Sequence, residues 1–526
     1  MTHSAAPAVS KSDAGHMLTG LRYGELVERR AERQPQRVAL IHNDQQWTYG
    51  ELLARIHGAA AFLVDRGVRP GDRVVCFSEN RPELLAAVYA CARVGAVFAP
   101  VGVASTAEEL IHVLLDLDAK ALLVTEETAQ KAAEAAEAVA VPQYLLVASS
   151  HLELEAMPSH TDIVLEAHCP EPDDPALIVY TSGTSGRPKG VVLSHRALFF
   201  NGVNTLLGLD IVSDDVTLVN TPFSHTAALN TLAINTLHKG GTVVIDRGFD
   251  ARRCLEQIAR HRITTLFAVP SMLALMTQDP GFDRADLTSL RWVLGGGAPM
   301  PPALVAVWAE RAVPVLASFG MTEAGPSVSF RRTSDAQGKS ASSGPPALLT
   351  DVRIVSPDGN PCPPGAVGEV WVHGPHLASG YWRNPDATRV TFVDGWLVTG
   401  DRGFVDDDGD LCISGRSKDT IITGGENVDP AEVEHLIAQH PAIKDVAVVG
   451  RPHPLWGEVV TAVVVTDQSV SADDLREFLR PHLAKFKIPR AVEQRSTLPR
   501  SSVGKLLRRE LTDPVDFSPI KPRSHE

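Results

Sequence analysis

The sequence predicts an α/β protein in which a large N-terminal domain precedes a small α+β C-terminal domain. Apolar runs typical of strands alternate with amphipathic stretches typical of helices, which is the pattern of a parallel sheet with crossover helices. The alternation occurs first at 73–77, 82–94, 121–124 and 129–140, and again at 242–245, 251–261 and 264–269. We therefore expect two α/β subdomains in the N-terminal domain.

The pattern changes farther along the chain. Between residues 351 and 372, short segments are separated by Pro-Asp-Gly, Pro-Pro-Gly and Val-Gly, which favours antiparallel strands and turns and suits a small β-barrel-like subdomain. An acidic turn at 406–410 leads into Gly415 and Arg416, and we place the domain boundary there, giving domains 1–416 and 417–526. The expected C-terminal elements are helices at 430–440 and 473–483 and strands at 446–449 and 462–465.

Length and composition are those of an ordinary globular protein. The 526 residues exceed what one hydrophobic core usually serves, and the chain is 44% apolar and 21% charged. A net charge of −14 argues against non-specific binding of nucleic acid or anionic membranes, which depend on clustered Lys and Arg. Because the first twenty residues contain no hydrophobic run, we expect a cytoplasmic protein without a transmembrane segment.

The cysteines follow no spacing typical of metal ligands, so we expect buried thiols in a reducing compartment and no structural zinc. They are Cys76, Cys91, Cys169, Cys254, Cys362 and Cys412.

The most informative segment runs from Tyr180 to Gly190 and has the sequence YTSGTSGRPKG. Glycines let backbone N–H groups approach oxyanions, Thr and Ser hydroxyls donate hydrogen bonds, and Lys189 supplies a positive charge, so this loop is suited to hold phosphate. It is not a Walker A loop, because counting from Gly183 puts Pro188 where that motif needs its second glycine.

This order of residues resembles the phosphate-binding signature of the adenylate-forming enzymes, which include acyl-CoA synthetases, nonribosomal-peptide adenylation domains and beetle luciferases. Five further segments resemble motifs of that superfamily, in order, across nearly the whole chain. The resemblance implies that the protein binds ATP and Mg²⁺. The residues implied to hold the β- and γ-phosphates are Thr181, Ser182, Gly183, Thr184, Ser185, Gly186 and Lys189.

One segment resembles the part of the family site that lies between adenine and the acyl group. It reads Gly295-Gly296-Gly297-Ala298-Pro299 and follows an apolar run. The resemblance places Gly297, Ala298 and Pro299 along the adenine, and it places Gly295 and Gly296 in the wall of the acyl pocket.

The next segment, Ser318-Phe319-Gly320-Met321-Thr322-Glu323, is similar to the family's aromatic-Gly-x-Thr-Glu motif. It is implied to stack on adenine through Phe319, to pass close to nucleotide and substrate at Gly320 and Met321, and to bond a phosphate oxygen through Thr322. Glu323 is implied to bind Mg²⁺ together with Thr184. Phe319 replaces the commoner Tyr, which keeps the stacking face and loses the phenol hydrogen bond.

A later stretch of the chain resembles the ribose site and the hinge of the family. Asp401, in Thr399-Gly400-Asp401, matches an Asp that accepts hydrogen bonds from the ribose hydroxyls, and Arg416 matches a second ribose and phosphate contact. Lys418 matches the hinge position. The resemblance thus implies a C-terminal domain that pivots to present one face for adenylation and another for thioester formation.

The last two segments lie in the C-terminal domain. The loop that contains Gly424, Gly425 and Glu426 resembles the one that lines the pantetheine tunnel of CoA ligases, although Asp429 departs from the usual uncharged residue there. Lys505 ends a Pro-Arg-Ser-Ser-Val-Gly-Lys run that matches the family's catalytic lysine.

The acyl pocket is implied by fewer residues. His225 matches a histidine that lies near the substrate carboxyl group in many acyl- and aryl-CoA ligases, and Ala228 stands where many relatives carry Gly. We find no carboxylate placed to receive an α-amine, which favours an apolar acid over an amino acid. Lys505, Thr184, Glu323 and His225 form the predicted catalytic set.

The favoured hypothesis is an ATP-dependent acid:CoA ligase that activates a fatty, alicyclic or aryl acid as acyl-AMP, releases pyrophosphate and then forms the acyl-CoA thioester. One alternative is an acyl-AMP ligase that loads the phosphopantetheine arm of a carrier protein. Arg451, Lys485 and Lys487 are basic residues available for free CoA. A second alternative is a non-catalytic sensor of nucleotide or acyl-adenylate, and a luciferase-like oxygenation is compatible with the fold. We expect a monomer or a homodimer.

Overall fold

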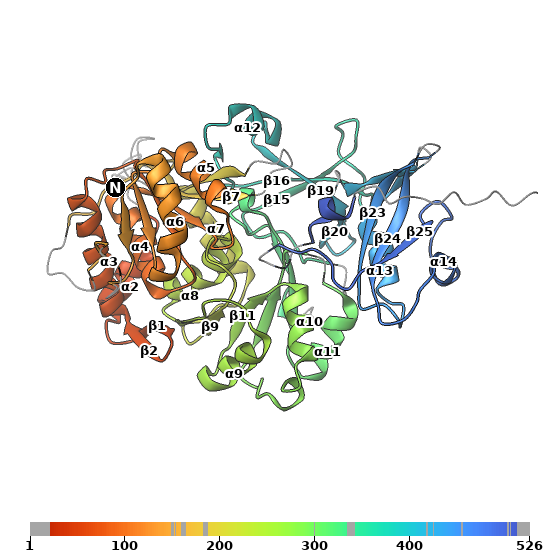
Figure 1. Ribbon diagram of the computed structural model, residues 1–526, viewed down its shortest axis with the longest axis horizontal. Helices are drawn as coiled ribbons and strands as arrows, with labels where there is room; N and C mark the ends of the chain where they lie inside the picture. The colour runs from red at the N-terminus through yellow and green to blue at the C-terminus, as the bar shows by residue number, and fades with distance from the viewer. Residues whose placement is uncertain are drawn as a thin grey trace, which may run out of the picture. The chain divides into compact units, whose positions relative to one another are not determined.

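The computed structural model describes residues 22–148, 152, 154–158, 165–181, 188–298, 300–333, 342–416, 419–423, 426–453, 456–501, 504 and 506–512 (Figure 1). The chain divides into two compact units. One contains Met1–Arg353 and Trp371–Val398, and the other contains Ile354–Val370 and Thr399–Glu526. The predicted α/β fold class, with a large N-terminal part and a smaller C-terminal part, is confirmed. The boundary at residue 416 stays a prediction.

An eight-stranded sheet in the first unit has the order β14-β13-β12-β11-β9-β10-β1-β2. All neighbouring pairs from β13 to β1 are parallel, and only the edge strands β14 and β2 are antiparallel. The inner strands are short and buried on both faces, as parallel strands covered by helices usually are. The strands are β1 (Val38–His42), β2 (Gln45–Thr48), β9 (Val216–Val219), β10 (Thr242–Ile245), β11 (Thr265–Ala268), β12 (Trp292–Gly295), β13 (Val315–Phe319) and β14 (Ser329–Phe330).

A seven-stranded sheet in the same unit has the order β17-β8-β7-β4-β3-β5-β6. Its strands from β7 to β6 are parallel neighbours, whereas β8 is antiparallel to both β7 and β17. The strands are β3 (Arg73–Phe77), β4 (Val97–Val101), β5 (Ala121–Val124), β6 (Gln143–Leu145), β7 (Pro175–Thr181), β8 (Lys189–Ser194) and β17 (Gly380–Tyr381).

Helices of the first unit begin and end at local sequence signals. Helix α4 has Pro82 in its first turn and ends at Gly95, whose φ of 76° is one that glycine adopts without strain. Capping boxes start α3 at Thr48 and α5 at Thr106. The helices are α2 (Glu25–Arg33), α3 (Tyr49–Asp65), α4 (Pro82–Val94), α5 (Ala107–Leu117), α6 (Glu126–Val139), α7 (His195–Gly208), α8 (Ile234–Lys239), α9 (Ala251–His261), α10 (Pro270–Gln278), α11 (Pro302–Glu310) and α12 (Pro385–Thr391).

The hydrophobic core of the first unit follows the alternation of side chains along the strands. In β3, Val74 and Cys76 belong to one buried cluster, and Val75 and Phe77 belong to another on the opposite face of the sheet. A third cluster covers the eight-stranded sheet on the side of α9, α10 and α11, which are drawn in green beside β9 and β11 in Figure 1. The two sheets are thus layered with helices, as the alternating sequence pattern predicts.

Antiparallel strands follow, in the region where the sequence predicts them. Strands β15 (Asp351–Val355), β16 (Gly368–His373) and β19 (Trp396–Val405) each contribute residues to both units. In the second unit β19 pairs with β20 (Leu411–Arg416), and the predicted turn at 406–410 joins the two. In the first unit β18 (Phe392–Val393) pairs with the start of β19.

The C-terminal part of the second unit is a small α+β fold, as predicted. Its sheet has the order β22-β21-β24-β23, with β25 parallel to β24. Apolar side chains of both helices, among them Val433 and Leu475, form one buried cluster with the sheet. The elements are β21 (Ile421–Thr423), β22 (Glu426–Val428), α13 (Pro430–Ile437), β23 (Asp445–His453), β24 (Gly457–Val465), α14 (Ala472–Leu479) and β25 (Ala491–Gln494).

The cysteines are free thiols, and most are shielded from solvent. Cys76, Cys91, Cys254 and Cys412 are buried, and Cys362 is half-buried. Cys169 is exposed, so the prediction of buried thiols is wrong there, because this residue lies in the irregular segment before β7. None of the helices in the described part of the chain has the length and apolar character needed to cross a membrane.

Candidate active site

The segment predicted to bind phosphate connects two antiparallel strands. Thr181 ends β7 and lies opposite Lys189, which begins β8, and the next pair is Tyr180 with Gly190. The hairpin therefore brings both ends of the predicted loop together. The loop residues between them, Ser182, Gly183, Thr184, Ser185 and Gly186, lie outside the described residues.

A tyrosine that the sequence analysis did not select lies beside this hairpin. Strand β17 places Tyr381 opposite Val191 of β8. The Tyr381 hydroxyl donates a hydrogen bond to Oε1 of Glu323 at 2.8 Å, and Nζ of Lys189 lies 5.3 Å from the centroid of the Tyr381 ring. Burial, with the Glu323 charge second, raises the pKa of Tyr381, so the hydroxyl remains a donor at neutral pH.

Three of the predicted segments lie at one edge of the eight-stranded sheet. Strands β9, β11, β12 and β13 are parallel neighbours, so their carboxyl ends meet at that edge, where open α/β sheets usually bind their ligands. The segment before His225 follows β9, Gly296 follows β12, and Gly320 follows β13. The fold thus brings the implied adenine, acyl and metal residues to a common edge.

The glycines at this edge leave no room for a side chain. A Cβ on Gly320 would lie 1.5 Å from the carbonyl oxygen of Pro326, and a Cβ on Gly296 would lie 2.9 Å from Oγ of Ser318. The Ser318 hydroxyl donates to the Gly295 carbonyl at 2.9 Å, which joins the ends of β12 and β13. The neighbouring site candidates differ in exposure: Phe319, Met321 and Thr322 are half-buried, whereas Gly297 and Ala298 are exposed.

The segment that carries His225 is fixed by several contacts. Its backbone N–H donates to the Pro222 carbonyl at 3.0 Å, and its side chain is half-buried. The hydroxyls of Thr226 and Thr322 are 3.5 Å apart, so this segment meets the one that ends in Glu323. Ala228 is only 1% exposed and lies in the π-helix Ala227–Ala233, within the buried core.

The implied ribose residues lie in the second unit. Asp401 and Arg416 are opposite each other on β19 and β20, and Nε of Arg416 is 2.8 Å from Oδ1 of Asp401. Asp401 is 4% exposed, and its backbone N–H donates to the Thr399 hydroxyl at 3.0 Å. The two residues that the family resemblance associates with ribose are therefore brought together.

Asp429, the departure from the family pattern, has a structural role. Its carboxylate caps α13 by accepting a hydrogen bond from the Ala431 N–H at 3.0 Å. It also lies against β20, since a Cβ on Gly415 would be 2.3 Å from Oδ1 of Asp429. Burial raises the pKa of this carboxyl. Glu426 begins β22, which is separated from β23 by two strands of the small sheet, β21 and β24.

Several other candidates cannot be placed, and one is placed differently from expectation. Pro299, Lys418, Gly424, Gly425 and Lys505 lie outside the described residues. Arg451 was expected as a surface residue available to CoA, but it is 2% exposed and pairs with Glu493. Alternation along β23 puts Arg451 on the same face as the buried Ala447 and Val449, and its guanidinium donates to the Leu511 carbonyl at 3.2 Å. Lys487 forms an ion pair with Glu432 at 2.7 Å.

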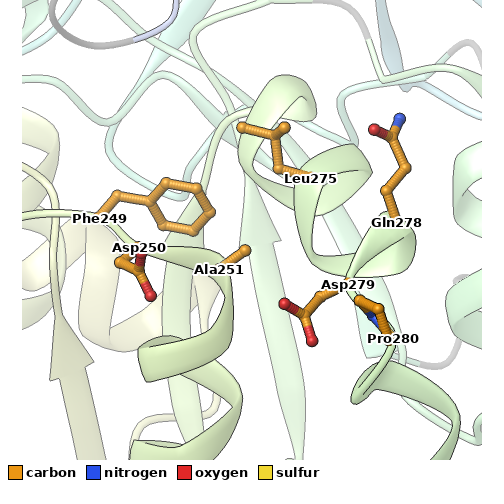
Figure 2. Close-up of a pocket in the computed structure, with 7 residues that line it drawn as sticks. All are labelled: Phe249, Asp250, Ala251, Leu275, Gln278, Asp279 and Pro280. Carbon is orange, nitrogen blue, oxygen red and sulfur yellow. The ribbon is translucent and has the colours of Figure 1, made fainter.

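A surface pocket of about 420 Å³ lies in the first unit (Figure 2). It is lined by Phe249, Asp250 and Ala251 at the start of α9 and by Leu275, Asp279 and Pro280 at the end of α10. The two carboxylates of the pocket accept hydrogen bonds from backbone N–H groups, Asp250 from Arg253 and Asp279 from Gly281. None of the predicted site residues that the structure describes lines this pocket.

Comparison with protein families decides the affiliation of the chain. The family model "AMP-binding enzyme" matches residues 27–382, and "AMP-binding enzyme C-terminal domain" matches residues 432–505. The chain belongs to the AMP-binding enzyme family. This AMP-binding enzyme is 40% identical over 491 residues to feruloyl-CoA synthase of an Amycolatopsis species, covering 93% of this chain and 98% of the relative.

Two further relatives of this AMP-binding enzyme are informative. The fatty acid–[acyl-carrier-protein] ligase ScoC of Streptomyces coeruleorubidus is 36% identical over 497 residues, covering 92% of this chain and 94% of ScoC. The o-succinylbenzoate CoA synthetase of Bacillus subtilis, in complex with its acyl-adenylate intermediate, is 32% identical with a TM-score of 0.82, covering 94% and 99% of the two chains. The predicted superfamily is confirmed, and the prediction of an AMP-forming acid–thiol ligase agrees with these relatives.

Sequence reasoning did not identify Tyr381 or Asn80. Asn80 is 3% exposed; its Nδ2 donates to the Thr221 and Asp246 carbonyls at 2.8 and 3.2 Å, and its Oδ1 accepts from the Phe223 N–H at 2.8 Å. The side chains of both residues form hydrogen bonds with segments that are distant in the sequence. The one local signal was the aromatic pair Tyr381-Trp382 after a glycine, which is too common to identify a site.

Proposed function

We propose that this protein is an ATP-dependent acid:CoA ligase that activates an aryl carboxylic acid as acyl-AMP and then forms the acyl-CoA thioester. The observation that carries the proposal is the contact of Glu323 with Tyr381, whose ring also faces Lys189. Through Tyr381, the carboxylate of Glu323, which is suited to bind a metal ion, is held near the positive charge of Lys189 at the end of the β7–β8 hairpin.

The first step asks a carboxylate to attack the α-phosphorus of ATP, which is a meeting of two anions. Positive charge and positioning therefore supply most of the catalysis. In our proposal Lys189 and the segment 181–186 hold the β- and γ-phosphates, and Lys505 lies between the substrate carboxylate and the α-phosphate. Phe319 stacks on the adenine, and Asp401 with Arg416 holds the ribose.

The single carboxylate of Glu323 is suited to a Mg²⁺ ion whose other ligands include the phosphates of ATP. Among the described residues, no group of three or more His, Cys, Asp or Glu side chains is placed to hold a metal by itself. Mg²⁺ is usually bound through one or two carboxylates and the phosphates of a substrate, and the buried Glu323 supplies one such carboxylate. When bound, the ion neutralises phosphate charge. Glu323, with Thr184, would hold it.

The acid class is proposed from the relatives and from the residues near His225. Two of the relatives described above are named for aryl acids, ferulate and o-succinylbenzoate. Phe319, Met321 and Ala227 are half-buried apolar residues in the segments of the sheet edge. We propose that His225 faces the acid's carboxyl group, with Gly295, Gly296 and Gly320 along the acyl chain.

The thioester step is proposed to use the loop that contains Gly424, Gly425 and Glu426, after a pivot at Lys418 of the domain 417–526. A carrier protein is the alternative acceptor, and ScoC is named for one. Free CoA remains the favoured acceptor because the relative with the higher identity, feruloyl-CoA synthase, is named for it.

The test is mass spectrometry of products after incubation with ATP, Mg²⁺, CoA and a graded panel of aryl, alicyclic and aliphatic acids. We expect aryl-CoA, AMP and pyrophosphate. Acyl-AMP and pyrophosphate without acyl-CoA would redirect the acceptor to a carrier protein. If no acid of the panel causes pyrophosphate to be released, the proposed function is contradicted and a non-catalytic sensor is favoured.

A further inference from the structure

The Tyr381 side chain lies between two groups to which the proposed function assigns different parts of the same ligand. Its hydroxyl donates to Oε1 of Glu323 at 2.8 Å. Nζ of Lys189 lies over its ring, 5.3 Å from the ring centroid. A single side chain therefore contacts the carboxylate proposed for Mg²⁺ and the ammonium group proposed for the triphosphate.

The hydrogen bond to Glu323 fixes the direction of a buried carboxylate. Glu323 is 8% exposed, and its backbone carbonyl accepts from the Ala378 N–H at 2.9 Å. Both its side chain and its backbone are thus bonded to the segment that contains Tyr381. Residues that hydrogen-bond a metal ligand orient it and commonly change metal affinity by 10- to 100-fold.

The ring contact restricts where Lys189 can place its charge. An ammonium group over an aromatic face is attracted by the ring quadrupole. Lys189 begins β8 directly after the phosphate-binding segment, so the ring holds its side chain at the end of that segment. The contact depends on the ring alone, whereas the Glu323 contact depends on the hydroxyl, and the two can be removed separately.

The backbone fixes the position of Tyr381. Strand β17 pairs with β8, and the Trp382 N–H donates to the Gly190 carbonyl at 2.7 Å. The Trp382 indole N–H donates to the Asp116 carbonyl at 3.0 Å. The segment is therefore bonded to the same strand that begins with Lys189, and its geometry does not depend on long flexible side chains.

We propose that Tyr381 is a positioning residue that holds Glu323 and Lys189 in one arrangement, so that the metal ion and the triphosphate of ATP are bound as a unit. This inference rests on the proposed function. Its consequence is that the gain in ATP affinity produced by Mg²⁺ depends on the Tyr381 hydroxyl.

Isothermal titration of ATP without acid, in the presence and absence of Mg²⁺, tests the inference through binding. For Tyr381→Phe we expect affinity for ATP with Mg²⁺ to fall about tenfold, which is the loss of one hydrogen bond to a charged group, while affinity for metal-free ATP stays within about twofold. Tyr381→Leu should weaken both. Tyr49→Phe is the matched control, since it removes a buried hydroxyl that bonds Leu237 and Gly241 in the core, and it should leave the Mg²⁺ effect unchanged.

The variant Glu323→Gln completes a double-mutant cycle. Adding Tyr381→Phe to Glu323→Gln should cause no further loss of affinity for ATP with Mg²⁺, because Tyr381 acts through that carboxylate. Equal Mg²⁺ effects in wild type and Tyr381→Phe, or additive losses in the cycle, would overturn the inference. Absence of ATP binding by the wild-type protein would instead contradict the proposed function.

Discussion

Replacing Asn80 with alanine should remove hydrogen bonds that connect the two sheets of the first unit and so destabilise that unit. Asn80 follows β3 of the seven-stranded sheet, and its amide bonds the backbone of Thr221, Phe223 and Asp246, which follow β9 and β10 of the eight-stranded sheet. The substitution removes three hydrogen bonds from a side chain that is 3% exposed. Two of these bonds hold the segment that leads to His225.

The magnitude follows from the groups left without partners. Each buried donor or acceptor that loses its hydrogen bond costs about 1 kcal/mol or more, so we expect about 3 kcal/mol for the Asn80 contacts. An unfolding entropy of about 2.1 cal/mol/K per residue over roughly 380 residues converts this to a decrease in Tm of about 4 °C. Asn80→Asp should be at least as harmful, because a carboxylate cannot donate to the Thr221 and Asp246 carbonyls.

The assay combines thermal unfolding with steady-state kinetics. For Asn80→Ala we expect a lower Tm and a KM for the acid that rises several-fold, with the KM for ATP changed less, because the loosened segment carries His225. Asn360→Ala, which removes an exposed amide that bonds Asp358, is the control and should change neither quantity. A wild-type Tm together with a wild-type KM for the acid would refute the reasoning.

Three further outcomes are expected. Gly320→Ala should abolish adenylation, measured by pyrophosphate release, because the added Cβ would lie 1.5 Å from the Pro326 carbonyl oxygen. Lys505→Ala should depress adenylation sharply while thioester formation from supplied acyl-AMP is less affected, whereas Lys444→Ala, a surface lysine paired with Asp467, should affect neither step. Burial lowers the pKa of His195 to about 4, and its Nδ1 accepts the Tyr23 N–H at 2.9 Å. Because the unfolded chain binds this proton below about pH 6.5, His195 should lower the free energy of unfolding by about 1.4 kcal/mol for each unit that the pH is lowered from 6.5 to 4. His195→Gln should therefore reduce the pH dependence of stability in urea titrations by about that amount.

Local signals in the sequence predicted several of the regular elements, although the helices expected at 430–440 and 473–483 end at Ile437 and Leu479. Strand β3 and helix α4 have the bounds that the sequence predicts for them, 73–77 and 82–94. The acidic turn before β20 was equally clear, because its geometry depends on neighbouring residues alone. Such features are encoded within a few residues of the place where they act.

Pairing between distant segments was not predictable in the same way. The apolar run before the phosphate-binding loop indicated β7, but nothing local indicated that Lys189 would begin an antiparallel partner strand. The contacts of Asn80 with Phe223 and of Tyr381 with Glu323 join residues 143 and 58 positions apart. The cap formed by Asp429 is different, because its signal is local: the helix expected at 430–440 begins at Pro430, which leaves Asp429 at the N-cap position, and the sequence analysis overlooked it.

The closure of the β7–β8 hairpin has a consequence for how this chain could be altered. Since Thr181 and Lys189 are held opposite each other by the sheet, the strands already bring together the two ends of the segment between them. The entropy lost on closing a loop grows only with the logarithm of its length, at about 0.6 kcal/mol per doubling. Residues can therefore be inserted or exchanged between the two strands with little cost to the stability of the sheet.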